Sequence, residues 1–117
     1  MAKSSKAELL QGTLDMLILK SLVGGPRHGY SIAQWIAATT EKALEVEEGS
    51  LYPALHRMER RGWIAADWGQ SESNRRAKFY QLTQTGKTQL SQAVTMWSRL
   101  VSAIDLVLEA DPAEGTR

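Results

Sequence analysis

The spacing of apolar residues divides the chain into four helical stretches and one pair of strands. Residues 9–22 carry apolar side chains on one broad face and two more on the opposite side. The broad face holds Leu10, Leu14, Leu17, Ile18 and Leu22, and the opposite side holds Met16 and Leu19. This pattern predicts a helix packed on two sides, against the core and against a second subunit. Gly24, Gly25 and Pro26 predict its end.

Two shorter helices follow. Residues 27–40 turn Ile32, Ala33, Trp35 and Ile36 inward. In residues 46–62, one face carries Leu51, Leu55 and Met58, at the four- and three-residue spacings of a buried helical face. The opposite face carries Gly49, Tyr52, His56 and Arg60. An exposed face with Tyr and His in place of Glu–Lys pairs favours contact with another molecule. Pro53 falls within the first two turns, where proline is tolerated.

A hairpin comes next. Gly62 ends the third helix, and residues 64–68 and 79–82 alternate in the manner of two half-buried antiparallel strands. The tip between them is polar and contains Arg75, Arg76 and Lys78. Helix, turn, helix and hairpin, followed by a long helix, is the element order of a winged helix-turn-helix. The predicted fold class is therefore mainly α within α+β, with a two-stranded wing.

The last helix has a heptad pattern. Thr83 is expected to cap it, and the apolar stripe Leu90, Val94, Trp97, Val101, Ile104 and Leu108 recurs at alternating spacings of four and three. So small a domain cannot cover this stripe, which favours a homodimer over the alternative of a helix folded back on its own core. The predicted interface adds Leu10, Leu14 and Leu17. We expect a DNA-binding unit at 1–82, a dimerisation helix at 83–110 and a frayed tail at 111–117.

Composition and charge narrow the class of protein. A chain of 117 residues with 43% apolar residues can bury one core, and the absence of cysteine excludes disulfides and thiolate metal sites. No apolar run approaches the roughly 20 residues that a membrane span needs, so we expect a soluble, cytoplasmic protein without membrane contact. The net charge is only +1, but residues 56–78 hold six Lys or Arg against three acids. This basic segment favours a nucleic-acid partner.

Catalysis is a weak alternative. His28 and His56 lie on different elements, and the chain has no Gly-rich phosphate loop, nucleophile elbow or H-E-x-x-H motif. We therefore expect no enzyme, no cofactor and no metal. A winged helix that makes only protein contacts remains the competing hypothesis.

Four motifs carry a resemblance to a known family. They are L-L-Q-G-T-L-D-M-L-I-L-K-S-L at 9–22, H-G-Y-S-I-A at 28–33, E-E-G-S-L-Y-P-A-L-H-R-M-E-R-R-G-W-I at 47–64 and R-A-K-F-Y-Q-L-T-Q-T-G-K at 76–87. Together they resemble the PadR family of bacterial transcriptional regulators, over residues 9–109, and the single C-terminal helix resembles its smaller subfamily. The resemblance implies a dimer built by the first and last helices, a recognition helix at 48–61 and a basic wing at 70–78.

One position departs from the family pattern. Relatives usually place Ser or Thr as a helix cap where this chain has Glu47. A carboxylate can still accept hydrogen bonds from the first-turn N–H groups, so the fold is not in doubt. A negative group near DNA would weaken or redirect binding.

The expected function is sequence-specific binding of a roughly palindromic duplex operator by a repressor dimer. In this hypothesis Gly49 permits close approach, Ser50, Tyr52 and His56 face bases or nearby phosphates, and Arg57 and Arg60 hold the backbone. Tyr30 and Ser31 begin a helix whose free N–H groups can meet a phosphate, although Tyr30 could instead only pack there. The full predicted set is Tyr30, Ser31, Gly49, Ser50, Tyr52, Pro53, His56, Arg57, Arg60, Arg75, Arg76 and Lys78.

Trp97 suggests an effector site. It occupies a position of the apolar stripe where Leu packs better, and two indoles across a two-fold axis would hold the helices apart. The predicted slot, lined by Trp97, Met96, Val94, Val101, Leu14 and Ile18, suits a flat aromatic molecule. Some PadR-like regulators that this chain resembles bind planar drugs at an equivalent tryptophan. The alternative is that Trp97 only fills the interface.

Overall fold

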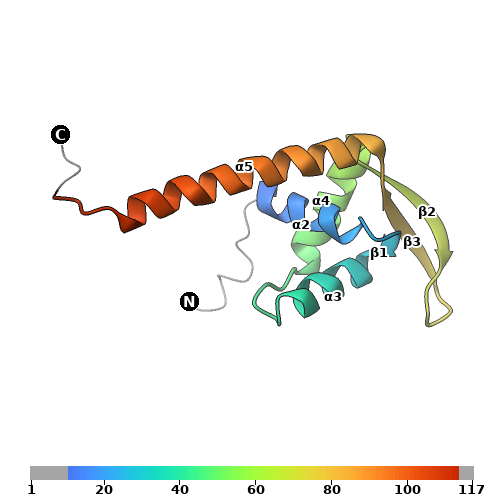
Figure 1. Ribbon diagram of the computed structural model, residues 1–117. Helices are drawn as coiled ribbons and strands as arrows, with labels where there is room; N and C mark the ends of the chain where they lie inside the picture. Colours follow the sequence, from blue (N-terminus) through green and yellow to red (C-terminus); the bar gives the residue numbers. More distant parts are fainter. Residues whose placement is uncertain (1–10, 114–117) are drawn as a thin grey trace.

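The computed structural model describes residues 11–113. Their elements are, in order, α2 (Gln11–Ser21), β1 (Arg27–His28), α3 (Gly29–Thr39), α4 (Glu48–Arg60), β2 (Ile64–Gln70), β3 (Arg76–Leu82) and α5 (Gln84–Glu109). Three helices and a small sheet form a body, from which α5 extends well to one side (Figure 1). The predicted winged helix-turn-helix with a long C-terminal helix is confirmed. Leu10 and residues 114–117 of the predicted tail lie outside the described residues.

The core forms where the apolar faces of α2, α3 and α4 meet the sheet. Its buried members are Leu14, Ile18, Leu19, Leu22, Ile32, Ile36, Leu51, Ala54, Leu55, Met58, Ile64 and Tyr80. The predicted inward face of α4 is confirmed, because its apolar side chains at helical spacing are all buried. The helix ends where Gly62 adopts a φ of 78°, a left-handed conformation that glycine accepts without strain.

The sheet has three strands rather than the predicted two. Its order is β1-β3-β2, and both pairings are antiparallel. In β1, Arg27 pairs with Tyr80 and His28 with Phe79, so α3 begins at Gly29 and not at residue 27. A strand of two residues has no alternation of its own that a sequence pattern could detect. The free edge of β3 supplies the hydrogen-bonding partners that define it.

Helix α5 begins at the predicted cap. The Thr83 hydroxyl accepts a hydrogen bond from the Gly86 N–H at 3.0 Å and donates to the carbonyl of Trp63 at 2.9 Å, which ties the helix to the start of the wing. The N-terminal part of α5 packs on α2. A helix of 26 residues is roughly 39 Å long, so its C-terminal half projects beyond the body (Figure 1).

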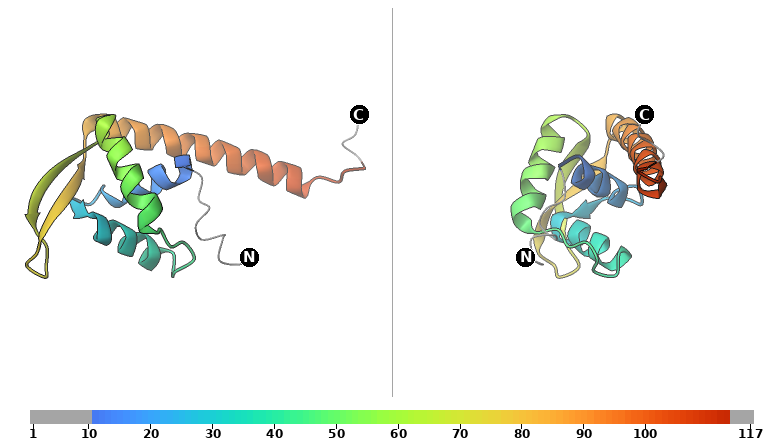
Figure 2. Two further views of the ribbon diagram at one scale, coloured as in Figure 1. Left: turned by 180° about the vertical axis from the view of Figure 1, so that it is seen from behind. Right: turned by 90° about the vertical axis from the view of Figure 1, so that its left-hand side faces the viewer.

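Helix α2 occupies the centre of the arrangement. It packs against α3, α4 and α5, and the end-on view places it between α4 and α5 (Figure 2, right). Helix α2 thus packs on more than one side within its own chain, and its predicted contact with a second subunit stays a prediction. Among the described residues, no helix is long and apolar enough to cross a membrane.

Candidate nucleic-acid interface

The outer face of α4 is polar, aromatic and basic. The exposed residues of α4 are Glu48, Gly49, Ser50, Tyr52, Pro53, His56 and Arg60. The opposite face is buried in the core, so the helix is held rigidly while this outer face remains open. A helix presented in this way has the width that the DNA major groove admits.

Tyr52 joins α4 to the start of α3. A methyl group added at Gly29 would lie 2.7 Å from the Tyr52 hydroxyl oxygen and 2.8 Å from a ring carbon. The missing side chain at Gly29 therefore gives the tyrosine ring room to lie against α3. Tyr52 keeps 37% of its surface exposed, so it is oriented by packing but still available for contact.

Side chains make hydrogen bonds at the start of α3. The Ser31 N–H donates to His28 Nδ1 at 3.2 Å, and the Ser31 hydroxyl accepts from Arg27 at 3.1 Å. The prediction of a free Ser31 N–H for a phosphate is therefore corrected, because the imidazole already caps this helix. Tyr30 projects outward and is 64% exposed, which does not fit the alternative that it only packs.

The wing carries exposed positive charge at Arg75 and Arg76. Its turn is closed by a hydrogen bond from the Ser71 N–H to the Arg75 carbonyl at 2.8 Å. On its surface the Arg76 guanidinium lies 4.9 Å from the centre of the Trp68 ring. Trp68 is 57% exposed, so it is a surface residue of the candidate site and was missed by the sequence analysis. The sequence signal was available, since a tryptophan close to an arginine-rich hairpin tip is a candidate stacking partner.

The basic residues of the site divide into free and paired groups. Within residues 11–113, no ion pair involves Arg60, Arg75 or Arg76. The Lys78 ammonium lies 3.2 Å from Glu59 Oε1, a half-exposed pair that solvent screens strongly. The three guanidiniums without an ion pair are therefore the groups best placed to meet phosphates.

Arg57 differs from the other basic residues of α4. Its guanidinium donates to Asp15 Oδ1 of α2 in an ion pair whose side chains are only 17% and 10% exposed. The predicted role of Arg57 in holding a DNA backbone does not fit this burial. The sequence signal for the pair was an acid within the apolar run of residues 14–19, which needs a buried partner. Burial raises the pKa of Asp15, and the charge of Arg57 opposes that rise.

A groove connects these parts. It has a volume of about 710 Å³, and α3, α4 and the wing form its walls. The lining includes His28, Gly29, Tyr30, Gln34, Tyr52, Trp68, Arg75, Arg76 and Lys78. The structure thus brings together, around one open depression, residues from three segments that the sequence analysis had assigned separately.

Glu47 does not act as the predicted substitute cap. It is the N-cap residue of α4 in an extended conformation, but its side chain makes no capping hydrogen bond. A Glu side chain is one methylene longer than the Asp that usually caps, and the first turn of α4 is exposed. The Glu47 carboxylate therefore does not cap the first turn, whereas its backbone carbonyl accepts from the Ser50 N–H at 3.0 Å.

The predicted effector slot and interface need correction. Ile18 is fully buried and Leu14 is 5% exposed in the core of the protomer, so neither can line an open slot or face a partner. Leu17 and Leu90 are half-buried and pack on the same core. Val94, Met96 and Trp97 are exposed, with Trp97 at 45%, and Val101 is half-buried. The accessible part of the stripe thus begins at Val94.

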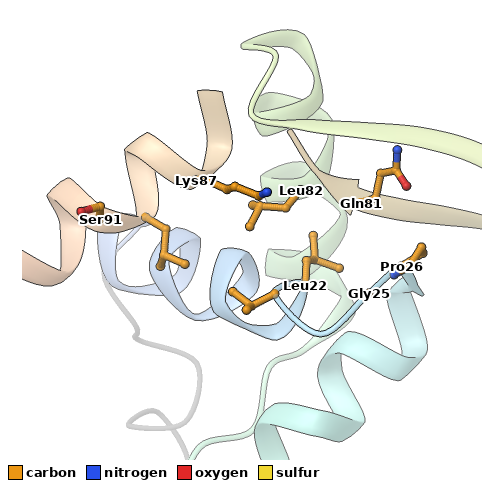
Figure 3. A pocket seen from close by; sticks show the side chains of 9 residues that line it. Leu22, Gly25, Pro26, Gln81, Leu82, Lys87 and Ser91 are labelled. Atoms are coloured by element: carbon orange, nitrogen blue, oxygen red, sulfur yellow. The ribbon is translucent and has the colours of Figure 1, made fainter. Parts of the chain in front are cut away.

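A separate cavity of about 410 Å³ lies where the end of α2, β3 and the first turns of α5 meet (Figure 3). Lys87, Leu82 and Leu22 lie around it in the close view (Figure 3). It shares no lining residue with the groove beside α4. None of the residues predicted for the effector slot lines it, so it is distinct from both features.

The histidines have separate roles. His28 caps α3 and stands edge-on to Phe79, with ring centres 5.3 Å apart, whereas His56 lies on the outer face of α4. Across the part of the chain that the structure describes, no three His, Asp or Glu side chains gather in a way that could hold a metal ion. The geometry of the site is that of a binding surface.

Known proteins share this arrangement. The sequence profile of the transcriptional regulator PadR-like family matches residues 18–92. The chain is 32% identical over 104 residues to a Lysinibacillus sphaericus protein named Uncharacterized protein X, covering 89% of this chain and 95% of the relative. A solved transcriptional regulator from Clostridium thermocellum superposes with a TM-score of 0.75 at 29% identity, covering 81% of this chain and 92% of that one.

A solved PadR family transcriptional regulator from Eggerthella lenta gives a TM-score of 0.74 at 30% identity, with 86% of each chain covered. The family profile spans more than half of the chain, including α3, α4, the whole wing and the first turns of α5. The chain therefore belongs to the PadR-like family of transcriptional regulators, which are regulatory DNA-binding proteins.

Proposed function

We propose that the protein is a homodimeric, sequence-specific repressor whose helix α4 enters the major groove while the wing follows the phosphate backbone. The observation that carries this proposal is the exposed face of α4 beside a groove whose wing side holds unpaired Arg75 and Arg76. Base edges are read by a helix in the major groove, whereas phosphate contacts set its position. Tyr52 of α4 lines the same depression as Arg75 and Arg76, and the other exposed residues of α4 continue the surface beside it.

The base-reading and phosphate-binding residues have distinct roles in this proposal. Ser50, Tyr52 and His56 face base edges, and Gly49 leaves the start of the helix without a side chain where the two surfaces meet. Arg60, Arg75 and Arg76 meet phosphates. Each phosphate contact releases counterions, so affinity should fall as salt rises, with a log–log slope of about 0.9 per contact.

Dimerisation is supported by α5. Beyond Ala93 the helix leaves its own body, and Trp97, Ile104 and Leu108 of the apolar stripe remain exposed. A second copy of α5 is the simplest cover for a heptad stripe. Two heads related by a two-fold axis would require a roughly palindromic operator with half-sites about one helical turn apart.

The test is titration with random and selected duplexes at two salt concentrations. Fragments selected from random DNA should share a dyad, and footprinting should protect two half-sites. Affinity for random duplex should fall steeply with salt. An asymmetric footprint over a single half-site would count against the dimeric reader.

The second candidate is a winged helix that contacts only proteins. Glu47 and Glu48 are exposed at the start of α4, and these acids oppose the approach of a phosphate backbone. The same titration separates the two functions, because a protein-contact module should have little affinity for duplex DNA at either salt concentration.

We further propose that a planar aromatic effector binds where the two copies of Trp97 meet and thereby releases the operator. Exposed Trp97 and Val94 support this site, with half-buried Val101 one turn further along the helix. In a variant with Phe at positions 35, 63 and 68, planar cationic dyes should quench Trp97 fluorescence in a saturable manner. Non-saturable quenching would leave Trp97 as an interface residue only.

A further inference from the structure

The ion pair between Asp15 and Arg57 joins two helices that are far apart in the sequence. Arg57 belongs to α4 and Asp15 to α2, and both side chains are largely buried. Arg57 Nε is also buried and has no hydrogen-bond partner. The guanidinium is therefore committed to this contact, since turning it outward would leave Asp15 buried without its partner charge.

The neighbours of Arg57 point elsewhere. His56 and Arg60 are exposed on the outer face of α4, while Ala54 and Met58 are buried. Arg57 thus lies on the boundary of the buried face, where its guanidinium meets α2 and its side chain is only 17% exposed. A change in this pair would alter how α4 sits on α2 without removing any group of the outer face.

Helix α2 connects this contact with the rest of the molecule. It packs on α4 on one side and on α5 on the other (Figure 2, right). Among the described residues the Asp15–Arg57 contact is the one ion pair between α2 and α4, and a charged hydrogen bond constrains the relative position of two helices more strictly than apolar packing does.

We propose that the Asp15–Arg57 pair is a positioning device for operator recognition, which fixes the register of α4 on α2, and that Arg57 does not contact phosphate. This inference rests on the proposed DNA-binding function. It assigns to Asp15, on a helix outside the DNA-facing groove, a role in the specificity of binding.

The experiment compares Asp15→Ala and Arg57→Gln with Arg60→Gln, an exposed arginine of the same helix. Affinity for selected operator and for random duplex is measured across a salt series. We expect Arg60→Gln to weaken binding to both duplexes and to reduce the salt slope by about one contact. We expect Asp15→Ala and Arg57→Gln to lower the operator-to-random ratio by about fivefold to a hundredfold, with the slope on random duplex unchanged.

Asp15→Ala is the decisive variant because it removes a negative charge. Electrostatics alone would tighten DNA binding, and freeing Arg57 would add a phosphate contact. Tighter binding, or an unchanged operator-to-random ratio, would overturn the proposal, as would a slope change in Arg57→Gln equal to that of Arg60→Gln. The double variant should lose no more specificity than the worse single variant, because both remove one interaction.

A milder variant is the control for a folding defect. Asp15→Asn keeps the shape and the acceptor oxygen, so it carries the test if Asp15→Ala fails to fold, with a smaller loss of the same sign. Wild-type protein without salt-dependent duplex binding would overturn the proposed function itself. Normal wild-type binding with an unaffected Asp15→Asn ratio would overturn only this inference.

Discussion

Two helical glycines have opposite surroundings. A methyl group at Gly86 would lie 2.0 Å from the Trp63 carbonyl oxygen, whereas one at Gly49 would meet nothing within 4 Å. The first position joins α5 to the wing by direct backbone contact. The second leaves open space on the outer face of α4.

Gly86→Ala should therefore lower the free energy of unfolding by about 1–3 kcal/mol or more, because backbone must move to admit the methyl group. Gly49→Ala is the matched control. It should leave stability unchanged or raise it by up to about 1 kcal/mol, since alanine favours the helix, while weakening operator binding. Urea unfolding at one fixed protein concentration measures the first effect. If Gly86→Ala were as stable as the wild type, the close contact between Gly86 and the Trp63 carbonyl would be contradicted.

The pH dependence of stability follows from the buried carboxyl of Asp15. Burial raises its pKa above the ordinary value of 3.8, with Arg57 opposing the rise and Arg61 adding a smaller opposing effect. A carboxyl with a raised folded-state pKa favours the folded state at low pH. This contribution is lost as the pH rises through the folded-state pKa.

Arg57→Met removes the main opposing charge, so the pKa of Asp15 should rise further. The variant should lose about 3–5 kcal/mol near pH 7, as expected when one member of a buried pair is removed. The deficit should shrink as the pH falls through the raised pKa of Asp15 and the carboxyl becomes neutral. Urea unfolding at several pH values tests this. Adding Asp15→Leu to Arg57→Met should abolish the pH dependence of the deficit, and a deficit independent of pH in the single variant would contradict the mechanism.

At the scale of elements, the wing and α4 should contribute differently to binding. Arg75→Ala with Arg76→Ala should weaken binding to all duplexes and flatten the salt dependence by about two contacts. Tyr52→Ala should instead lower the preference for operator over random duplex. Tyr52→Phe is the control for packing on Gly29, since it keeps the ring and removes only the hydroxyl. Equal losses of specificity in the wing and Tyr52→Ala variants would contradict this division.

At the scale of the whole molecule, the exposed stripe of α5 should hold two copies together. Trp97→Glu or Ile104→Glu places a charge in the proposed interface, and the cost of burying it should shift the protein to monomers. The loss of dimers should also lower operator affinity, because each DNA-binding unit of a monomer binds alone. Thr95→Glu, on the opposite side of α5, is the control and should remain dimeric. Sedimentation equilibrium gives the masses, and a dimeric Ile104→Glu would exclude this interface.

Elements whose patterns are local could be predicted from the sequence alone. The three- and four-residue spacing of Leu51, Leu55 and Met58 predicted the buried face of α4. Thr83 predicted the start of α5, because its hydroxyl bonds to the N–H of Gly86, only three residues further along the chain. The family resemblance could also be identified from the sequence, because each of its motifs is a continuous run of residues. These features depend on neighbouring residues, so periodicity and capping chemistry specify them.

Features that depend on distant partners could be seen only in the folded chain. The two residues of β1 became a strand because β3 offers a free edge. The predicted DNA contact of Arg57 is not supported, because its guanidinium binds Asp15, 42 positions away, where α2 and α4 meet. The sequence places Leu14 in the predicted interface and both Leu14 and Ile18 in the predicted effector slot, because a helical pattern marks an apolar face but not what covers it. The protomer's own core covers both residues, since burial is a property of the assembled fold.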